Sequence, residues 1–289
     1  MLFPKELWPE VYLDDRIFQR PFEEKSWSPA RPDLETSVFG TLDDIIMRYQ
    51  LLGLVSLDLG LGLEKARFYF AWSGRAFLRA AKLPMREGLD VMPAFSAFGI
   101  TGDEKAAREF ARDWAKGEVV QKEGESELCE NEWSFSLNYV LAGHASGDSH
   151  LREKSVDYLK NKKPYKKFGA AGTAWFEAMR ELALLCIEEK KPDPFEALTK
   201  AAMQNQAYWK TGWEDDVVFE RWFAWNLFGF AAIAKQRGWS VPAKDPHPSI
   251  PLGLLRLPKM AIPDGEWLRP DEETHMAIAR AEKEAGNMC

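Results

Sequence analysis

The sequence has few cysteines and histidines, the side chains that build most disulfide, zinc and nucleophilic sites. Only three of its 289 residues are Cys, and no two of them form a CxxC pair. This count excludes a disulfide framework and a zinc knuckle. Because disulfides persist in oxidising compartments, we expect Cys129, Cys186 and Cys289 to be reduced thiols of a cytoplasmic protein.

Catalytic motifs are missing as well. There is no GxSxG nucleophile elbow, and the stretch LGLGLEK lacks the Lys-Ser/Thr ending of a phosphate-binding loop. None of the four histidines belongs to the adjacent His-Asp pair of an all-α, metal-dependent phosphohydrolase. His144 and His150 lie six residues apart in a turn, on no common helix face. We therefore expect no catalytic residue, metal site or cofactor, and a structural or solvent-facing role for the histidines.

No apolar run is long enough to span a bilayer. The most apolar stretch, residues 222–234, is interrupted by Asn226, and the run LLGLVSLDLGLGL contains Asp58. The first residues, MLFPKELWPEVYLDDR, carry acids and prolines where a signal peptide has a basic start and an apolar run. We expect neither a membrane segment nor a secretory leader.

Acidic residues outnumber basic ones, with 45 Asp and Glu against 38 Lys and Arg and a formal net charge of −7. Phosphate groups recruit Lys and Arg, so direct binding to nucleic acid is not expected. Complementary electrostatic fields steer association between proteins. The expected partner is therefore a basic protein.

Helical periodicity is the main pattern of the sequence. Apolar residues recur at three- and four-residue spacing, and no window shows sustained β-strand alternation. Predicted helices span residues 41–60, 61–83, 101–117, 131–147, 150–162, 170–191, 193–210, 214–237 and 271–286. The first begins with Thr41 as its N-cap. We expect one all-α domain over residues 1–289, built of irregular antiparallel helical hairpins that form one bundle.

Two segments rich in proline interrupt this pattern. Residues 1–35 have no sustained period and are expected to form an extended arm over the core, because proline biases its predecessor away from helix. Residues 240–270 hold seven of the 17 prolines but remain apolar. We expect them to form an ordered loop that packs on the bundle.

The stretch WKTGWEDDVVFERWFAWNLFGFAAIAKQRGW contains Glu214, Asp215, Asp216 and Glu220. Carboxylates at i and i+4 share a helix face and would suit a magnesium-dependent all-α enzyme. Such enzymes need a second acidic motif, and Asp43-Asp44 is followed by no third acid. The preferred interpretation places acids 214–216 in the first turn of a helix, where the dipole favours negative charge. The body of this helix is apolar on almost every side, and Gly238 suits its C′ position.

A second acidic cluster precedes a tryptophan. The stretch EGESELCENE is followed at once by Trp133, and its glutamates are Glu123, Glu125, Glu127, Glu130 and Glu132. An acidic patch beside an aromatic anchor is suited to a basic protein partner. We therefore predict that a partner contacts this cluster together with acids 214–216.

The segment RWFAWNLFGFAAIAKQRGWSVPAKDPHPSIPLGLL resembles the C-terminal part of the immunity protein 49 family of bacterial polymorphic toxin systems. In that family an apolar helix ends in a turn with alanine shortly before Arg-Gly, and an apolar segment with a proline follows. The matching residues are Ala231, Ala234, Arg237, Gly238, Ser249, Pro251 and Leu252. The stretch FYFAWSGRAFLRAAKLP is similar to the family's N-terminal helix.

This resemblance implies a cytoplasmic, all-α antitoxin without enzymatic activity. Such a protein binds a cognate toxin, often a nuclease, in a stoichiometric complex and occludes its active site. Two alternatives stay open, namely the magnesium-dependent enzyme with Asp215, Asp216 and Glu220, and a helical scaffold for host proteins. A broad polar concave face would favour the scaffold.

Overall fold

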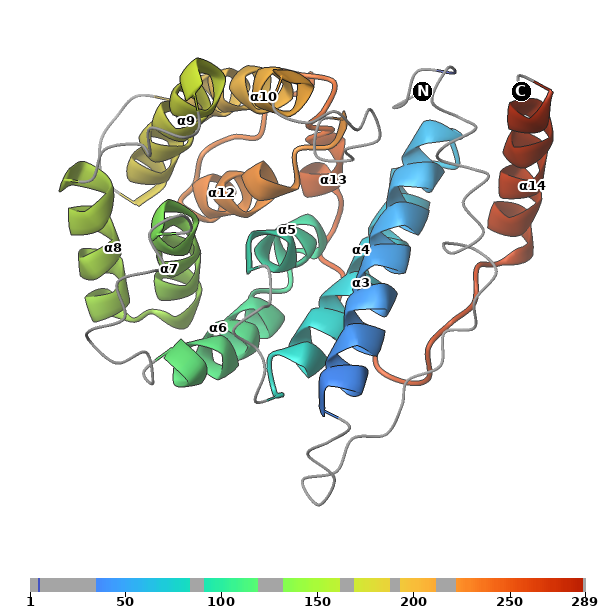
Figure 1. The fold of residues 1–289 in the computed structure, drawn as a ribbon, viewed down its shortest axis with the longest axis horizontal. Helices are drawn as coiled ribbons and strands as arrows, with labels where there is room; N and C mark the ends of the chain where they lie inside the picture. Colours follow the sequence, from blue (N-terminus) through green and yellow to red (C-terminus); the bar gives the residue numbers. More distant parts are fainter. Residues whose placement is uncertain are drawn as a thin grey trace.

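The structure is a computed structural model that describes residues 5, 35–83, 91–118, 132–161, 169–187, 193–211 and 222–287. Within these ranges the regular elements are helices and there is no strand, which confirms the all-α class (Figure 1). Their order is α3 (Glu35–Asp58), α4 (Leu63–Ala80), α5 (Val91–Thr101), α6 (Glu104–Glu118), α7 (Glu132–Ser146), α8 (Ser149–Asn161), α9 (Gly169–Ile187), α10 (Pro194–Thr211), α12 (Trp225–Gln236), α13 (Gly253–Arg256) and α14 (Glu272–Gly286). None of the described helices is long and apolar enough to cross a membrane.

Helices that follow one another pack in pairs, and one pair joins distant parts of the chain. The pairs α3–α4, α7–α8 and α9–α10 each form extensive contacts, as expected for helical hairpins. Helix α5 instead packs mainly against α12, more than 120 residues later in the sequence. In Figure 1 these two helices lie in the middle, with α6, α7, α8, α9 and α10 around them and α3, α4 and α14 to one side.

Two glycines allow the close approach of α5 and α12. A Cβ atom added at Gly99 would lie 2.8 Å from the Ala232 Cβ and 3.1 Å from the Phe228 carbonyl oxygen. A Cβ at Gly229 would lie 3.2 Å from the Phe95 Cβ. Real Cβ atoms seldom come this close, so the backbones meet where one partner lacks a side chain. The sequence had not predicted α5, because its eleven residues are almost all apolar and show no helical period.

Helix α12 is the buried helix predicted from the sequence, but it starts later. All residues from Trp225 to Ala234 are buried, which confirms burial on nearly every side. The predicted continuous helix from 214 to 237 is wrong, because the helix breaks before α12 begins at Trp225; acids 214–216 themselves lie outside the described residues. Ala224 leaves helical geometry, with ψ of 71°, and its N–H donates to the Ser249 carbonyl oxygen at 3.0 Å. The apolar sequence runs through this break, so periodicity could not reveal it.

The C-terminal end of α12 forms the predicted glycine turn. Gly238 has φ of 91° at the C′ position, in the left-handed region that glycine adopts without steric cost. Its N–H donates to the Lys235 carbonyl at 3.0 Å, and the Trp239 N–H donates to the Ala234 carbonyl at 3.1 Å. These two bonds are those of a Schellman motif, and they confirm the helix end. The Arg237 guanidinium donates to the Cys186 carbonyl near the end of α9.

Two other predicted helix starts are corrected. Helix α3 begins at Glu35, so Thr41 is inside the helix and is not its N-cap. The helix extends through Gly40 toward the N-terminus, since a single glycine inside a helix costs only about 1 kcal/mol, which tertiary packing can offset. The segment predicted over 101–117 begins at Glu104, because Gly102 has φ of 70° and separates α5 from α6. The Asp103 carboxylate then caps α6 by accepting from the Ala106 N–H at 3.0 Å.

The proline-rich segment 240–270 is an ordered loop on the bundle, as predicted. It contains the single turn α13, and its buried apolar residues are Ile250, Leu252, Leu254 and Leu255. The Met260 N–H donates to the Thr101 carbonyl at 2.8 Å, and the Ile262 N–H donates to the Asp103 carboxylate at 2.8 Å. Further along, Trp267 packs on Trp72, with ring centroids 5.9 Å apart. The predicted N-terminal arm lies outside the described residues, apart from Lys5 and Glu35.

Candidate functional site

A cleft of about 200 Å³ opens where four helices meet near the centre of the fold. It is bordered by the last turns of α5, α7 and α12 and by the first turns of α6. Its apolar lining residues include Phe95, Phe98, Leu141, Ala145, Ala232 and Ile233, and polar groups make up about half of the exposed lining. The α5–α12 pairing therefore creates the wall, and the ends of these helices bring polar side chains to the mouth.

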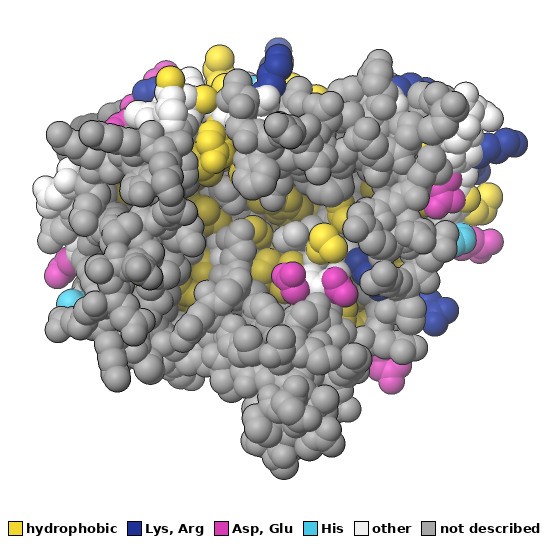
Figure 2. Space-filling view, in the orientation of Figure 1, with side chains coloured by type: hydrophobic (Ala, Val, Ile, Leu, Met, Phe, Trp, Pro, Cys, Tyr) yellow, Lys and Arg dark blue, Asp and Glu magenta, His cyan; other side chains and the backbone are white. Residues whose placement is uncertain are grey.

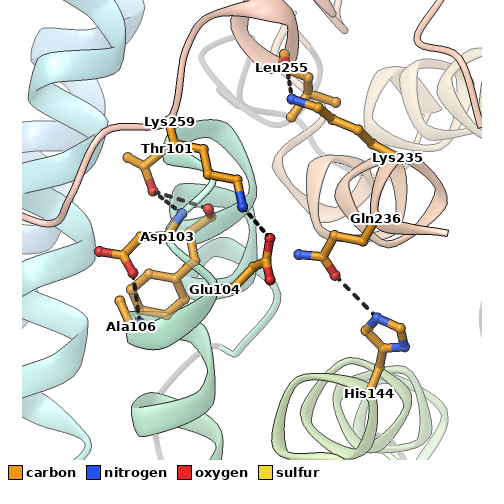
Figure 3. Close-up of polar contacts among 10 residues, drawn as sticks. Thr101, Asp103, Glu104, Ala106, His144, Lys235, Gln236, Leu255 and Lys259 are labelled. Atoms are coloured by element: carbon orange, nitrogen blue, oxygen red, sulfur yellow. Dashed lines mark hydrogen bonds and ion pairs between the residues drawn. The ribbon is translucent and has the colours of Figure 1, made fainter. Parts of the chain in front are cut away.

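Glu104 is the main carboxylate at the mouth of this cleft. It is the first residue of α6, and it accepts a hydrogen bond from the Lys259 ammonium at 2.6 Å. Both side chains are largely exposed, at 47% for Glu104 and 71% for Lys259. In Figure 3 the Glu104 carboxylate lies between Lys259 and the Gln236 amide. An ion pair this exposed contributes little to stability, and a ligand can compete for its carboxylate.

His144 and Gln236 form a second polar pair at the mouth. The His144 Nε2 lies 3.2 Å from the Gln236 Oε1 (Figure 3). Because an amide oxygen only accepts, Nε2 carries the hydrogen and donates it. Burial lowers the pKa of His144 below its usual value of 6.5. The hydrogen bond to Gln236 opposes this pKa shift, and the nearby Arg152 and Arg237 add to it. At neutral pH the ring is therefore uncharged.

Asp103 and Arg108 complete the charged groups of the cleft lining. The Asp103 carboxylate is used within the fold, since its oxygens accept from the Ala106 and Ile262 N–H groups. Arg108 is exposed and lies one helical turn after Glu104 on α6. Glu104 is therefore the carboxylate that remains available to a ligand, and Arg108 and Lys259 are the cations beside it.

A wider groove of about 520 Å³ lies between α4, α6 and residues 261–264. Its basic side chains are Arg75, Arg79, Lys82 and Lys105. Several already interact within the fold: Lys82 pairs with Glu109 at 2.7 Å, and the Arg75 guanidinium lies 4.7 Å from the ring centroid of Trp267. The Arg75 contact fastens the proline-rich loop to α4, and the Lys82–Glu109 pair joins the end of α4 to α6. We assign this groove a structural role.

Figure 2 shows hydrophobic side chains gathered in a hollow in the middle of one face, with acidic side chains beside them. Among the described residues, the large hydrophobic side chains that are exposed elsewhere are isolated from one another. They are Met47, Met203, Leu268 and Met276. Scattered exposed apolar residues are normal in soluble folds and mark no binding site by themselves.

The predicted contact residues lie largely outside the described part of the chain. Residues 123, 125, 127, 130, 214, 215 and 216 are outside it, as is Glu220 of the alternative magnesium site. Glu132 and Trp133 begin α7, the helix whose other end brings His144 to the cleft. Within the described ranges, no group of three or more His, Cys, Asp or Glu side chains is arranged to hold a metal ion.

Of the residues at the cleft mouth, only His144 was named in the sequence, where it was placed in a turn; it lies instead in the last turn of α7. Glu104 resembles any first-turn acid of a helix, and its partner Lys259 is 155 residues away in the loop. Gln236 precedes the Arg-Gly turn of α12, which the sequence had predicted as a helix end without pointing to Gln236. Comparison of the chain with family models, curated proteins and solved structures finds no match.

Proposed function

We propose that this chain is a cytoplasmic immunity protein that binds a cognate bacterial toxin, a nuclease, and blocks its active site in a stoichiometric complex. The observation that supports this most is the position of the residues shared with the immunity protein 49 pattern. They surround one structural unit, the C-terminal end of the central helix α12 and the loop packed against it.

Five of the seven matching residues have a clear structural role at the ends of α12. Ala231 and Ala234 are buried in the core, and Gly238 forms the left-handed turn. Arg237 ties α12 to the end of α9, and the Ser249 carbonyl accepts from the N–H that precedes α12. The pattern therefore describes how a buried helix is held at both ends. Such a pattern follows a fold, and it supports the proposed function only through the resemblance to the family.

The charge of the chain supports a basic partner. With a net charge of −7, the protein attracts a nuclease whose surface is positive enough to bind nucleic acid. Occlusion by a protein surface needs no catalytic group on the immunity protein. The glutamates at 123–132 and acids 214–216 remain the predicted contacts. Charge reversal at Glu125, Glu127 and Glu130 should weaken the complex and reduce its salt dependence.

Co-expression tests the proposal directly. The toxic C-terminal domain of a polymorphic toxin encoded beside this chain is expressed in a bacterial host, with and without the protein. We expect survival only with the protein and recovery of a one-to-one complex. A toxin domain of the same activity from another system serves as the specificity control. Cell death in the presence of soluble, abundant protein would contradict the proposal.

A further inference from the structure

We propose that the cleft between α5, α6, α7 and α12 receives an arginine side chain of the basic partner, with its guanidinium on Glu104. This inference rests on the proposed function, because it names one contact of the toxin complex. Three features of the cleft support it, namely its size, the apolar residues in its wall and the acceptors at its mouth.

The size and wall of the cleft fit one long side chain. Its volume of about 200 Å³ is below the roughly 300–1,000 Å³ of pockets for small molecules. The inner wall contains Phe95, Phe98, Leu141 and Ile233, and the polar groups stand at the mouth. Lys and Arg combine an apolar stem with a charged head and bury the stem along apolar surface. An aliphatic or aromatic side chain would leave the carboxylate at the mouth unmatched.

The mouth of the cleft favours positive charge. Helices α5, α7 and α12 end at it, and the negative ends of their three dipoles outweigh the positive end of α6, the one helix that begins there. The Glu104 carboxylate is exposed there, and the Gln236 oxygen keeps a free lone pair beside the bond from His144. Because the His144 ring is neutral, it does not repel an incoming cation. Arginine suits these separated acceptors better than lysine, since its planar fork carries five donors.

Two cations of the chain lie beside Glu104, where the partner's guanidinium would bind. Lys259 holds Glu104 at 2.6 Å, and Arg108 is one turn away on the same helix. In the free protein Lys259 neutralises the carboxylate and Arg108 adds positive charge nearby, and on binding the guanidinium replaces Lys259. Removal of either cation should therefore tighten the complex, while removal of Glu104 should weaken it. If the Glu104–Lys259 pair were purely structural, removing Glu104 and removing Lys259 would change the affinity for the toxin in the same direction.

The first experiment measures toxin binding by calorimetry at constant ionic strength. We expect Glu104→Gln to weaken the complex about tenfold, and Lys259→Met and Arg108→Gln each to strengthen it about threefold. Glu181→Gln is the matched control, because Glu181 and Lys200 form an ion pair of the same 2.6 Å length and similar exposure on α9 and α10. Equal affinity of wild type and Glu104→Gln would overturn the inference and leave the proposed function intact. Failure of wild type to protect cells would overturn the proposed function.

The second experiment needs no toxin. Acetyl-arginine methylamide is titrated into the free protein, and the side-chain amide of Gln236 is followed by NMR. We expect a saturable shift in wild type that is lost in Glu104→Gln and kept in Glu181→Gln. Acetyl-norleucine methylamide has a similar stem without the charge and should cause a smaller shift. An equal or larger shift from norleucine, or no shift from arginine at its solubility limit, would overturn the inference.

Discussion

The contact between α5 and α12 can be tested by adding one methyl group. In Gly99→Ala the new Cβ would lie 2.8 Å from the Ala232 Cβ, about 0.7 Å short of a carbon–carbon contact of roughly 3.5 Å. It would also lie 3.1 Å from the Phe228 carbonyl oxygen, which belongs to the backbone and cannot rotate away. Overpacking of this kind costs about 1–3 kcal/mol. Neither neighbouring atom can rotate away, which puts the cost in the upper part of this range, at about 2–3 kcal/mol. Alanine gains up to about 1 kcal/mol of helix propensity over glycine, so we expect a net loss of about 1–2 kcal/mol.

Urea unfolding followed by circular dichroism measures this loss. Gly286→Ala is the control, because a Cβ at Gly286 meets open space at the end of α14. A double-mutant cycle with Ala232→Gly removes the methyl group that the new Cβ would meet. We expect Ala232→Gly to cost less in the Gly99→Ala background than alone, with a coupling of about 1 kcal/mol. A Gly99→Ala protein as stable as wild type would refute the close approach of α5 and α12.

Three further predictions concern stability. Gly238→Ala should cost about 1–2 kcal/mol in urea unfolding, because a φ of 91° strains any residue with a Cβ; Gly286→Ala should cost nothing. Tyr69→Phe should cost about 1 kcal/mol by the same assay, because it removes a buried 2.9 Å hydrogen bond to the Thr274 hydroxyl that joins α4 to α14; an unchanged unfolding midpoint would contradict this docking of α14. Burial lowers the folded-state pKa of His144 and His247 below 6.5, so the unfolded chain binds protons more readily just below that pH. Their contribution to stability should be complete above pH 6.5 and be lost as pH falls through the folded-state pKa, and His144→Gln should flatten this part of the urea-midpoint profile.

Local rules in the sequence were enough for some elements and not for others. Helix α14 was predicted closely, because Asp271 caps it and its apolar residues keep the helical period. The end of α12 was predicted because Gly238 has one local conformational role. Helix α5 was missed, and so was the break before α12, because a uniformly apolar sequence shows neither a helical period nor a helix boundary. Those two helices are set by tertiary packing, chiefly by Gly99 against α12.

The same reason explains why the cleft could not be read from the sequence. Its wall depends on α5, and its mouth joins Glu104 of α6 to Lys259 of the loop and His144 of α7 to Gln236 of α12. None of these pairs has a sequence spacing that a local rule recognises. Only the distant pairing of α5 with α12 places the helix ends together. The candidate site is therefore a property of the packing, while the all-α class is a property of the local sequence.

Stability and binding should be separable at this cleft. The Glu104–Lys259 pair is largely exposed, and exposed pairs contribute about 0–1 kcal/mol. We therefore expect Glu104→Gln and Lys259→Met to unfold within about 1 kcal/mol of wild type. Gly99→Ala, by contrast, should loosen the wall of the cleft together with the fold. If Glu104→Gln unfolds much more easily than Glu181→Gln, the carboxylate is a structural group, and weaker toxin binding by that variant would then report a damaged fold and not a lost contact.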